Sequence, residues 1–387
     1  MKAKRMLSLL AAGVMLMGTL AGCNGGDSAS DGEKKLVIGG IGPTSGAAAT
    51  YGQAVRNGAK LAVDEINKAG GINGYQVEFL FEDDENDPQK AVNAYNTLMD
   101  QGMQILMGTV TSKPCIAVLA DTEEDNIFML TPSGSALECV SKDNAFRICF
   151  NDPSQGKEAA RYIADNGLAT KIAVIYNNAD PYSDGIYKQF AAEAGSRNLE
   201  IACAEAFTDA SATDFSAQLQ KVKDSGADLL FLPIYYEAAA YVLTQAKQTG
   251  LDIKVFGCDG LDGVIGQLGD NASVAEGVML LTPFAADSKE EKSQKFTAAY
   301  QAAYNKEIPN QFAADAYDAI YTIKAAAEKG GVKADMKVSD ICEAMKAAMV
   351  QITVDGVTGE MTWTADGEVS KYPKAMIIKD GGYTAAE

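Results

Sequence analysis

The feature that most constrains the fold of this chain is a regular alternation of short apolar segments with longer amphipathic ones, which occurs in two series. The apolar segments have the length and composition of buried β-strands, at residues 35–40, 76–82, 104–108 and 127–131 and then at 171–176, 199–205, 228–233 and 253–257. One segment with helical spacing separates each strand from the next. Strands joined by single helices form parallel sheets with helices on both faces, so the two series predict an α/β protein with two doubly wound, Rossmann-like lobes.

Capping patterns support several of the predicted helices. The helix after the first strand is expected to end at Gly70-Gly71, and Asp87 followed by Pro88 is typical of an N-cap and the first helical position. Pro114 is expected to open the helix after the third strand. The rest of the chain is predicted to be mostly helical over 288–349, with strands near 358–363 and 375–379.

The composition excludes most catalytic chemistry. The 387 residues include 33 Lys and Arg against 52 Asp and Glu, a net charge of −19, and there is no histidine. An acidic surface repels phosphate backbones, which argues against nucleic-acid binding. Without histidine, Ser-His and Cys-His nucleophiles and all His-containing metal sites are excluded, and no C-x-x-C motif is present. We therefore expect a protein that is not an enzyme and needs no metal or cofactor.

The N-terminus has the pattern of an export signal. A basic start is followed by an apolar run over 6–20, too short for a comfortable membrane span but right for a signal peptide. The run ends in Leu20-Ala21-Gly22-Cys23, which looks like a bacterial lipobox. We expect a signal peptide at 1–22, a lipidated Cys23, a flexible linker to residue 35, and anchoring on the outer face of the cell membrane. The alternative is an ordinary secretory signal with an incidental cysteine.

Unusual residues follow the predicted strands, where ligands bind in open parallel sheets. In the first series, residues 109–112 and 131–135 form small, hydroxyl-rich loops at helix starts, an arrangement that holds an anion without a basic side chain. In the second series the strand ends carry Tyr182, Tyr235 and Asp259. Each feature alone is also typical of turns and caps, but their shared location predicts a site for a zwitterion between the lobes.

Several motifs together resemble a known family: Gly42-Pro43-Thr44-Ser45-Gly46, Tyr51-Gly52, Asp64-Glu65-Ile66-Asn67 with Gly70-Gly71-Ile72, Thr131-Pro132, Asp152 with Gln155-Gly156, and Tyr182-Ser183-Asp184-Gly185. Over about 36–380 the chain is similar to the leucine/isoleucine/valine-type (type 1) periplasmic substrate-binding proteins of ABC importers, in lipoprotein form. The resemblance implies an amino-acid ligand, branched-chain favoured, captured by closure of two lobes and delivered to permease and ATPase subunits.

The resemblance also implies where the lobes and the site lie. A three-strand hinge would cross near Asn151, Thr282 and Gly359, giving one lobe from 36–151 plus 283–358 and another from 152–282 plus 359–387. The implied ligand-binding residues are Ser112, Ser133, Gly134 and Ser135 for the α-carboxylate, Tyr182, Tyr235 and Asp259 for the ammonium, and Tyr51 and Phe312 for the side-chain pocket. The family often has Glu at the position of Asp259. A disulfide found in some members is absent, since its positions look like Asn86 and Thr111.

Other interpretations are a sensor subunit of the same fold and a secreted Rossmann-type enzyme. Gly40, Gly42 and Gly46 after a strand are similar to a dinucleotide fingerprint, with Asp83-Asp84 as the ribose-binding acid, but the spacing is wrong and Pro43 occupies the turn. The acidic run at 82–87 lacks the spacing of an EF-hand and is expected to be a solvated loop with an N-cap.

Two of the cysteines leave a further alternative open. Cys139 and Cys149 are ten residues apart and flank a turn at 142–144, and export would permit a disulfide between them. The other interpretation is two buried free thiols.

Overall fold

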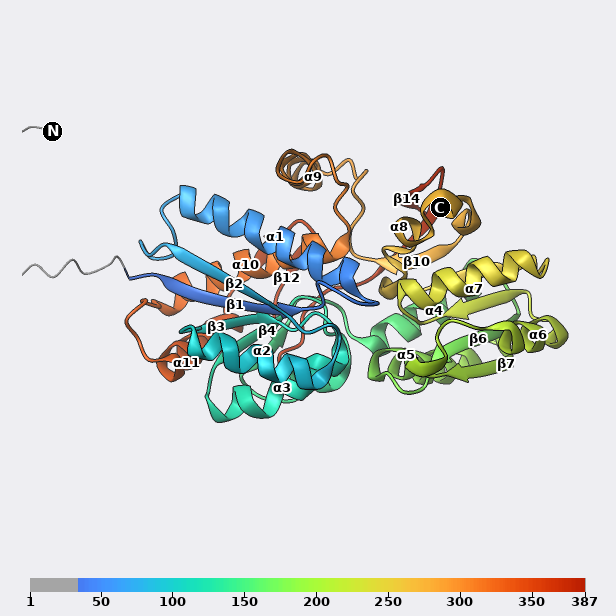
Figure 1. The fold of residues 1–387 in the computed structure, drawn as a ribbon, viewed down its shortest axis with the longest axis horizontal. Coiled ribbons are helices and arrows are strands. Elements are labelled where there is room, and N and C mark those ends of the chain that lie inside the picture. The colour runs from blue at the N-terminus through green and yellow to red at the C-terminus, as the bar shows by residue number, and fades with distance from the viewer. Residues whose placement is uncertain (1–33, 387) are drawn as a thin grey trace, which may run out of the picture. The chain divides into compact units, whose positions relative to one another are not determined.

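Two β-sheets organise the chain in the computed structural model, which describes residues 34–386 (Figure 1). The expected signal peptide at 1–22, the lipidated Cys23 and nearly all of the linker lie outside the described residues. Within the described residues, no helix combines the length and the apolar character needed to cross a membrane.

The first sheet is entirely parallel, in the order β2-β1-β3-β4-β5. Its strands are β1 (Leu36–Gly42), β2 (Val77–Asp83), β3 (Ile105–Gly108), β4 (Phe128–Thr131) and β5 (Ala145–Arg147). The first four were predicted from their apolar runs. Strand β5 was missed because it has only three residues and carries an arginine at its end.

Helices cover both faces of this sheet, as expected for strands joined by helical crossovers. They are α1 (Ala49–Lys68), α2 (Pro88–Asp100), α3 (Ser112–Glu124), α10 (Gln311–Gly330) and α11 (Val338–Met349). Buried residues of α2 and α3 form one apolar cluster with the sheet, whereas those of α1, α10 and α11 belong to another. The chain therefore returns to this sheet after building the second one.

The second sheet has the order β14-β13-β10-β9-β8-β6-β7. Its strands are β6 (Lys171–Asn177), β7 (Glu200–Phe207), β8 (Leu229–Leu232), β9 (Lys254–Gly257), β10 (Met279–Thr282), β13 (Lys374–Lys379) and β14 (Gly382–Ala385). The five strands from β6 to β10 are parallel, and β13 and β14 add antiparallel pairs at one edge. The predicted α/β class with two doubly wound sheets is confirmed.

The helices of this half again lie on both faces. Buried residues of α4 (Asp152–Asp165) and α5 (Pro181–Ser196) pack in one cluster, and those of α6 (Ser216–Ser225), α7 (Tyr236–Gln248) and α8 (Val264–Leu268) pack in another. The latter cluster is continuous with the α1 and α10 side of the first sheet. One apolar core therefore runs through both halves of the described chain.

The last part of the chain links the two sheets again. Helix α9 (Glu291–Ala303) precedes α10, and a small hairpin, β11 (Val354–Gly356) and β12 (Gly359–Met361), follows α11. After β12 the chain still contacts the first half, because the indole nitrogen of Trp363 donates to the carbonyl of Arg147 at 2.8 Å. The lobe boundaries expected near residues 151, 282 and 359 remain predictions.

Capping explains where several helices begin. Asp87 caps α2 by accepting from the Lys90 N–H at 2.9 Å, as predicted. Helix α1 ends as expected, since Gly70 and Gly71 have φ of 108° and 81°, which favour glycine. Helix α3, in contrast, begins at Ser112 rather than Pro114. Extended Thr111 precedes it, and proline is tolerated within the first turn because its missing N–H needs no helical partner there.

The disulfide interpretation is wrong. Cys139 and Cys149 are both free thiols and both buried. Cys139 packs in the cluster of α2 and α3 beside Cys115, whereas Cys149 is not part of that cluster. Both thiols lie near the guanidinium of Arg147, but they are not bonded to each other.

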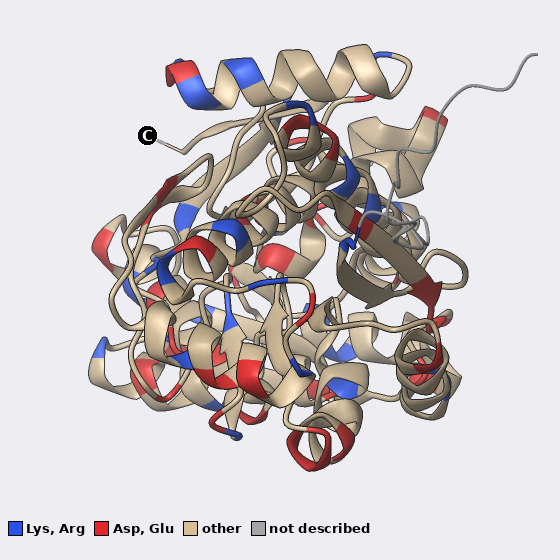
Figure 2. Cartoon of the chain, turned by 90° about the vertical axis from the view of Figure 1, so that its left-hand side faces the viewer, with Lys and Arg blue, Asp and Glu red and all other residues tan. Residues whose placement is uncertain are grey.

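Figure 2 shows ribbon segments with Lys or Arg interspersed with segments with Asp or Glu. Within the described residues many of these charges form short-range pairs, such as Lys60–Asp64 at 3.0 Å. This mixed pattern differs from the continuous basic surface that follows a phosphate backbone.

Candidate functional site

A small buried cavity lies where the two sheets present the loops after their strands. It is lined by Tyr51, Val110, Thr111, Ser133, Tyr182, Tyr235, Asp259, Gly260 and Phe312. Six of the nine predicted ligand-binding residues are among them, drawn from both halves of the chain. Ser112, Gly134 and Ser135 do not line it. The cavity volume is only about 10 Å³, room for about one water molecule.

The hydroxyl-rich loops after β3 and β4 are bound to each other. The hydroxyl of Ser133 donates to the carbonyl of Val110 at 2.6 Å, and the hydroxyl of Ser112 accepts from the N–H of Ala136 at 3.2 Å. The hydroxyl of Thr131 donates to the carbonyl of Thr109 at 2.6 Å. Much of the hydroxyl content predicted to hold a carboxylate is therefore used to join the two loops.

Some polar groups of these loops nevertheless have no partner. The hydroxyls of Thr111 and Ser135 are buried and form no hydrogen bond within the described residues, although Ser135 lies near the Asp152 carboxyl. The backbone N–H of Ser135 also finds no acceptor in residues 34–386. Buried polar groups are normally satisfied, so unpaired donors around a cavity indicate a place for an acceptor such as a carboxylate. Thr111 belongs to the hydroxyl-rich loop at 109–112 that was predicted to hold an anion, but it was not among the named ligand-binding residues.

A buried cation, Arg147, lies behind the loop that follows β4. Its guanidinium donates to four carbonyl groups in succession, those of Gly134 and Ser135 at 3.3 and 2.6 Å and of Ala136 and Leu137 at 2.8 and 3.3 Å. Sequence reasoning assigned no basic residue to the site. The signal that could have found Arg147 is its position inside an otherwise apolar segment at 145–150.

Asp259 supplies a buried carboxylate from the second half of the chain. Its Oδ1 accepts from the hydroxyl of Tyr182 at 2.7 Å, and its N–H donates to the side-chain oxygen of Gln155 at 3.1 Å. Burial raises the pKa of the Asp259 carboxyl to about 7. An added cation beside this carboxyl would restore its charged form.

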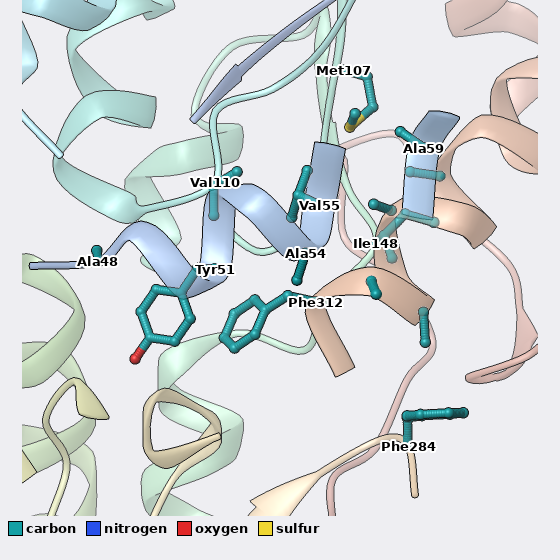
Figure 3. Packing of buried hydrophobic residues seen from close by; sticks show 14 of the residues in the cluster. Ala48, Tyr51, Ala54, Val55, Ala59, Met107, Val110, Ile148, Phe284 and Phe312 are labelled. Carbon is teal, nitrogen blue, oxygen red and sulfur yellow. The ribbon is translucent and has the colours of Figure 1, made fainter. Parts of the chain in front are cut away.

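Aromatic rings fill most of the remaining space. The rings of Tyr51 and Phe312 lie side by side with centroids 4.2 Å apart, and Figure 3 shows them at the ends of their helices. Tyr182 and Tyr235 stack at 4.8 Å. The hydroxyl of Tyr51 donates to the carbonyl of Gly260 at 2.5 Å, so Tyr51 joins α1 to the loop after β9.

Further hydrogen bonds connect the same two halves, and sequence reasoning predicted none of them. The Tyr51 hydroxyl accepts from the N–H of Tyr236 at 3.1 Å. Gln311, at the start of α10, donates from its side chain to the Asp259 carbonyl at 2.7 Å and from its backbone to Asp262 at 2.9 Å. The structure is therefore a closed form in which protein groups alone bridge the cleft.

The acidic loop after β2 has a structural role. Asp83 accepts from the Thr44 N–H at 2.8 Å and from the Ser45 hydroxyl at 2.6 Å, so it is occupied and does not offer a ribose-binding acid. Asp84 is buried, and burial raises the pKa of its carboxyl to about 7. Among the described residues, no cluster of three or more Cys, Asp or Glu side chains is arranged to hold a metal ion.

Comparison with known proteins places this geometry in context. A family model described as periplasmic binding protein matches residues 35–380. The leucine-, isoleucine-, valine-, threonine- and alanine-binding protein of Pseudomonas aeruginosa is 30% identical over 334 residues, which cover 86% of each chain. A Leu/Ile/Val-binding protein of Rhizobium johnstonii is 30% identical over 84% of this chain and 89% of its own length.

A solved structure extends the likeness to three dimensions. The branched-chain amino acid transporter substrate-binding protein of Streptococcus pneumoniae, in complex with isoleucine, is similar with a TM-score of 0.83 and 31% sequence identity. The match covers 92% of this chain and 99% of that one.

Proposed function

The chain belongs to the periplasmic binding protein family and has its type 1 fold, and from this premise we propose that it is an extracytoplasmic protein that captures an amino acid and delivers it to an ABC permease. The family consists of solute-binding proteins of transporters and is not an enzyme class. Branched-chain amino acids are the first candidates, because the relatives include Leu/Ile/Val-binding proteins and a complex with isoleucine.

The observation that carries this proposal is the pairing of unlike groups across one cavity. Thr111, from the first half, lines it with a buried hydroxyl that lacks a partner, and Asp259, from the second half, lines it with a carboxyl. A free amino acid has a carboxylate for the first and an ammonium for the second. Such a ligand satisfies both sides only when both are close to it, so it stabilises the closed state.

The remaining predicted residues take roles in the same proposal. Ser112, Ser133, Gly134 and Ser135 form the surroundings of the α-carboxylate, Tyr182 and Tyr235 flank the ammonium beside Asp259, and Tyr51 and Phe312 wall the side-chain pocket. Because the cavity of the closed form holds about one water molecule, a ligand has to enter while the cleft is open, and the aromatic rings have to move apart around it.

Anchoring is a separate part of the proposal. The basic start, the short apolar run and the sequence Leu20-Ala21-Gly22-Cys23 support export and lipidation at Cys23, which would tether the protein to the outer face of the membrane. Replacing Cys23 with Ala should release the protein from the membrane fraction. If the Cys23→Ala protein stayed there, lipidation would not be the anchor.

A thermal-shift screen against the twenty amino acids tests the ligand class. A ligand at 100 times its dissociation constant adds about 2.7 kcal/mol to the free energy of unfolding, a clear rise in melting temperature. We expect leucine, isoleucine or valine to give the largest rise. If no amino acid shifts the melting temperature and calorimetry also finds no binding, the proposed function is wrong.

A further inference from the structure

Arg147 is a buried positively charged side chain that contacts the loop after β4. Its side chain is fully buried, and it does not line the cavity. Its guanidinium is ringed by the carbonyls of residues 134–137, the loop that carries Ser135. The positive charge of the guanidinium therefore lies against the carbonyl side of the loop.

These hydrogen bonds fix the direction of the peptide groups. In a planar trans peptide, the carbonyl of one residue and the N–H of the next point in opposite directions. Because the carbonyls of residues 134–136 point to Arg147, the N–H groups of Ser135, Ala136 and Leu137 point away from it. The N–H of Ala136 donates to the hydroxyl of Ser112, so this side of the loop faces the loop after β3, which contributes Thr111 to the cavity.

One carboxylate forms an ion pair with Arg147. Glu368 lies 3.4 Å from the guanidinium, and its side chain is 26% exposed. Asp152, Cys139 and Cys149 are buried neighbours of the guanidinium, and burial raises the pKa of each, which opposes formation of further negative charge there. The guanidinium therefore places a positive charge directly behind the loop, with Glu368 as its ion-pair partner.

We propose that Arg147 is the positioning residue of the carboxylate subsite: by holding the carbonyls of residues 134–137 it fixes the peptide N–H groups of the loop on the opposite side, toward the loop after β3 and the cleft, and it places a positive charge behind them without touching the ligand. This inference rests on the proposed function and deepens it. It explains how a site without a basic side chain in its wall binds an anionic group, because oriented backbone dipoles and a buried cation supply the favourable field.

The experiment compares an amino acid with its amide, since the two differ in the charge at this subsite. Calorimetry gives both dissociation constants for the wild type and for three variants, and their ratio is the discrimination against the amide. Arg147→Gln removes the charge, whereas Arg147→Lys keeps the charge but loses the planar set of N–H donors of the guanidinium. Glu368→Gln removes the carboxylate partner of Arg147 but keeps a side-chain oxygen that can accept from Asn151.

We expect Arg147→Gln to lower the discrimination about tenfold and Arg147→Lys to restore part of it. Glu368→Gln should change it in the opposite direction, raising it severalfold, because the guanidinium then loses its carboxylate partner at 3.4 Å. The control is Glu360→Gln, an equal change of charge at an exposed position of β12, which should leave the ratio unchanged.

A purely structural role for Arg147 gives a different pattern. The acid and the amide would then weaken equally in Arg147→Gln, and Glu368→Gln would leave the ratio unchanged or lower it. Either result overturns the inference while wild-type amino-acid binding still supports the proposed function. If Arg147→Gln does not fold, Glu368→Gln alone decides the question. Failure of the wild type to bind any amino acid would instead remove the proposed function itself.

Discussion

The hydroxyl of Tyr182 donates a 2.7 Å hydrogen bond to the carboxylate of Asp259, and both side chains are buried in the same wall of the cavity. Tyr182 begins the helix after β6 and Asp259 follows β9, so the pair joins the ends of two strands of the second sheet. This bond stabilises the ionised carboxylate, whereas burial opposes ionisation and is the larger effect. A ligand ammonium group beside Asp259 would favour the ionised carboxylate and so lower its pKa.

Replacing Asp259 with Asn should weaken binding of an amino acid by roughly 2–5 kcal/mol, as expected when one partner of a desolvated charge pair is lost. The shape of the side chain is kept, and the Tyr182 hydroxyl still finds an oxygen acceptor. A des-amino analogue of the ligand is the control and should lose little affinity or gain some. Isothermal titration of both ligands at pH 8 measures the difference, and equal weakening of the two would show that Asp259 is only structural.

Binding should also release a proton below pH 7. Burial raises the pKa of Asp259 to about 7 in the closed form, so between pH 4 and 7 this form holds a proton that an exposed carboxyl lacks. Its stability relative to the open or unfolded chain therefore falls as the pH rises through this range. A bound ammonium lowers the pKa again, so the affinity should rise with pH up to about 7 and then level off.

Titrations at pH 6 in two buffers of different ionisation enthalpy count the released protons. Burial also raises the pKa of Asp262 and Asp315, each to about 6, and that of Asp152. The Asp259→Asn variant separates the contributions, since the release should fall in it. An unchanged proton count in this variant would assign the linkage to the other carboxyls.

Much of the fold could be predicted from the sequence because its signals are local. Apolar runs identified eight parallel strands, and Asp87-Pro88 located a helix start at the correct residue. Strand β5 was missed because it has only three residues, and the role of Arg147 was missed for a different reason. The partners of Arg147 are backbone carbonyls of a neighbouring loop, and side-chain patterns do not encode such contacts.

The candidate site shows the same limit. The resemblance to the binding-protein family predicted six of the residues that line the cavity, including Tyr51 and Phe312, which are far apart in sequence. It also placed Ser112 at the ligand, whereas in the structure its hydroxyl accepts from the Ala136 N–H and the hydroxyl of Thr111 is left without a partner. Which of two adjacent hydroxyl residues faces a cavity depends on where the helix begins, and Pro114 suggested a start two residues too late.

Thr111 therefore provides a test of the hydroxyl assignment. Thr111→Val keeps the shape and removes the hydroxyl, and it should weaken binding of the amino acid by about 1.5–3 kcal/mol if that hydroxyl donates to a carboxylate. The amide should be affected less. Thr353→Val, at an exposed position, is the matched control and should bind as the wild type does. A smaller effect for Thr111→Val than for Ser112→Ala would reverse the order of the two residues.

Tyr51 provides a test of closure. Its hydroxyl donates to the Gly260 carbonyl and accepts from the Tyr236 N–H, so it bridges the two halves of the closed form. Tyr51→Phe keeps the ring that packs on Phe312 but leaves both backbone groups buried and unpaired in the closed form, at a cost of about 1–3 kcal/mol each. In the open form water satisfies them, so the equilibrium should move toward the open form.

Small-angle scattering without ligand should therefore give a larger radius of gyration for Tyr51→Phe than for the wild type, and a saturating amino acid should bring both to the same compact value. Affinity should fall by about tenfold, because binding must then supply more of the free energy of closure. Tyr241→Phe is the matched control, since Tyr241 is 37% exposed on α7, and it should change neither quantity. If Tyr51→Phe had the wild-type radius and affinity, the Tyr51 hydroxyl would make no net contribution to closure, and the ligand's own contacts would have to hold the two halves together.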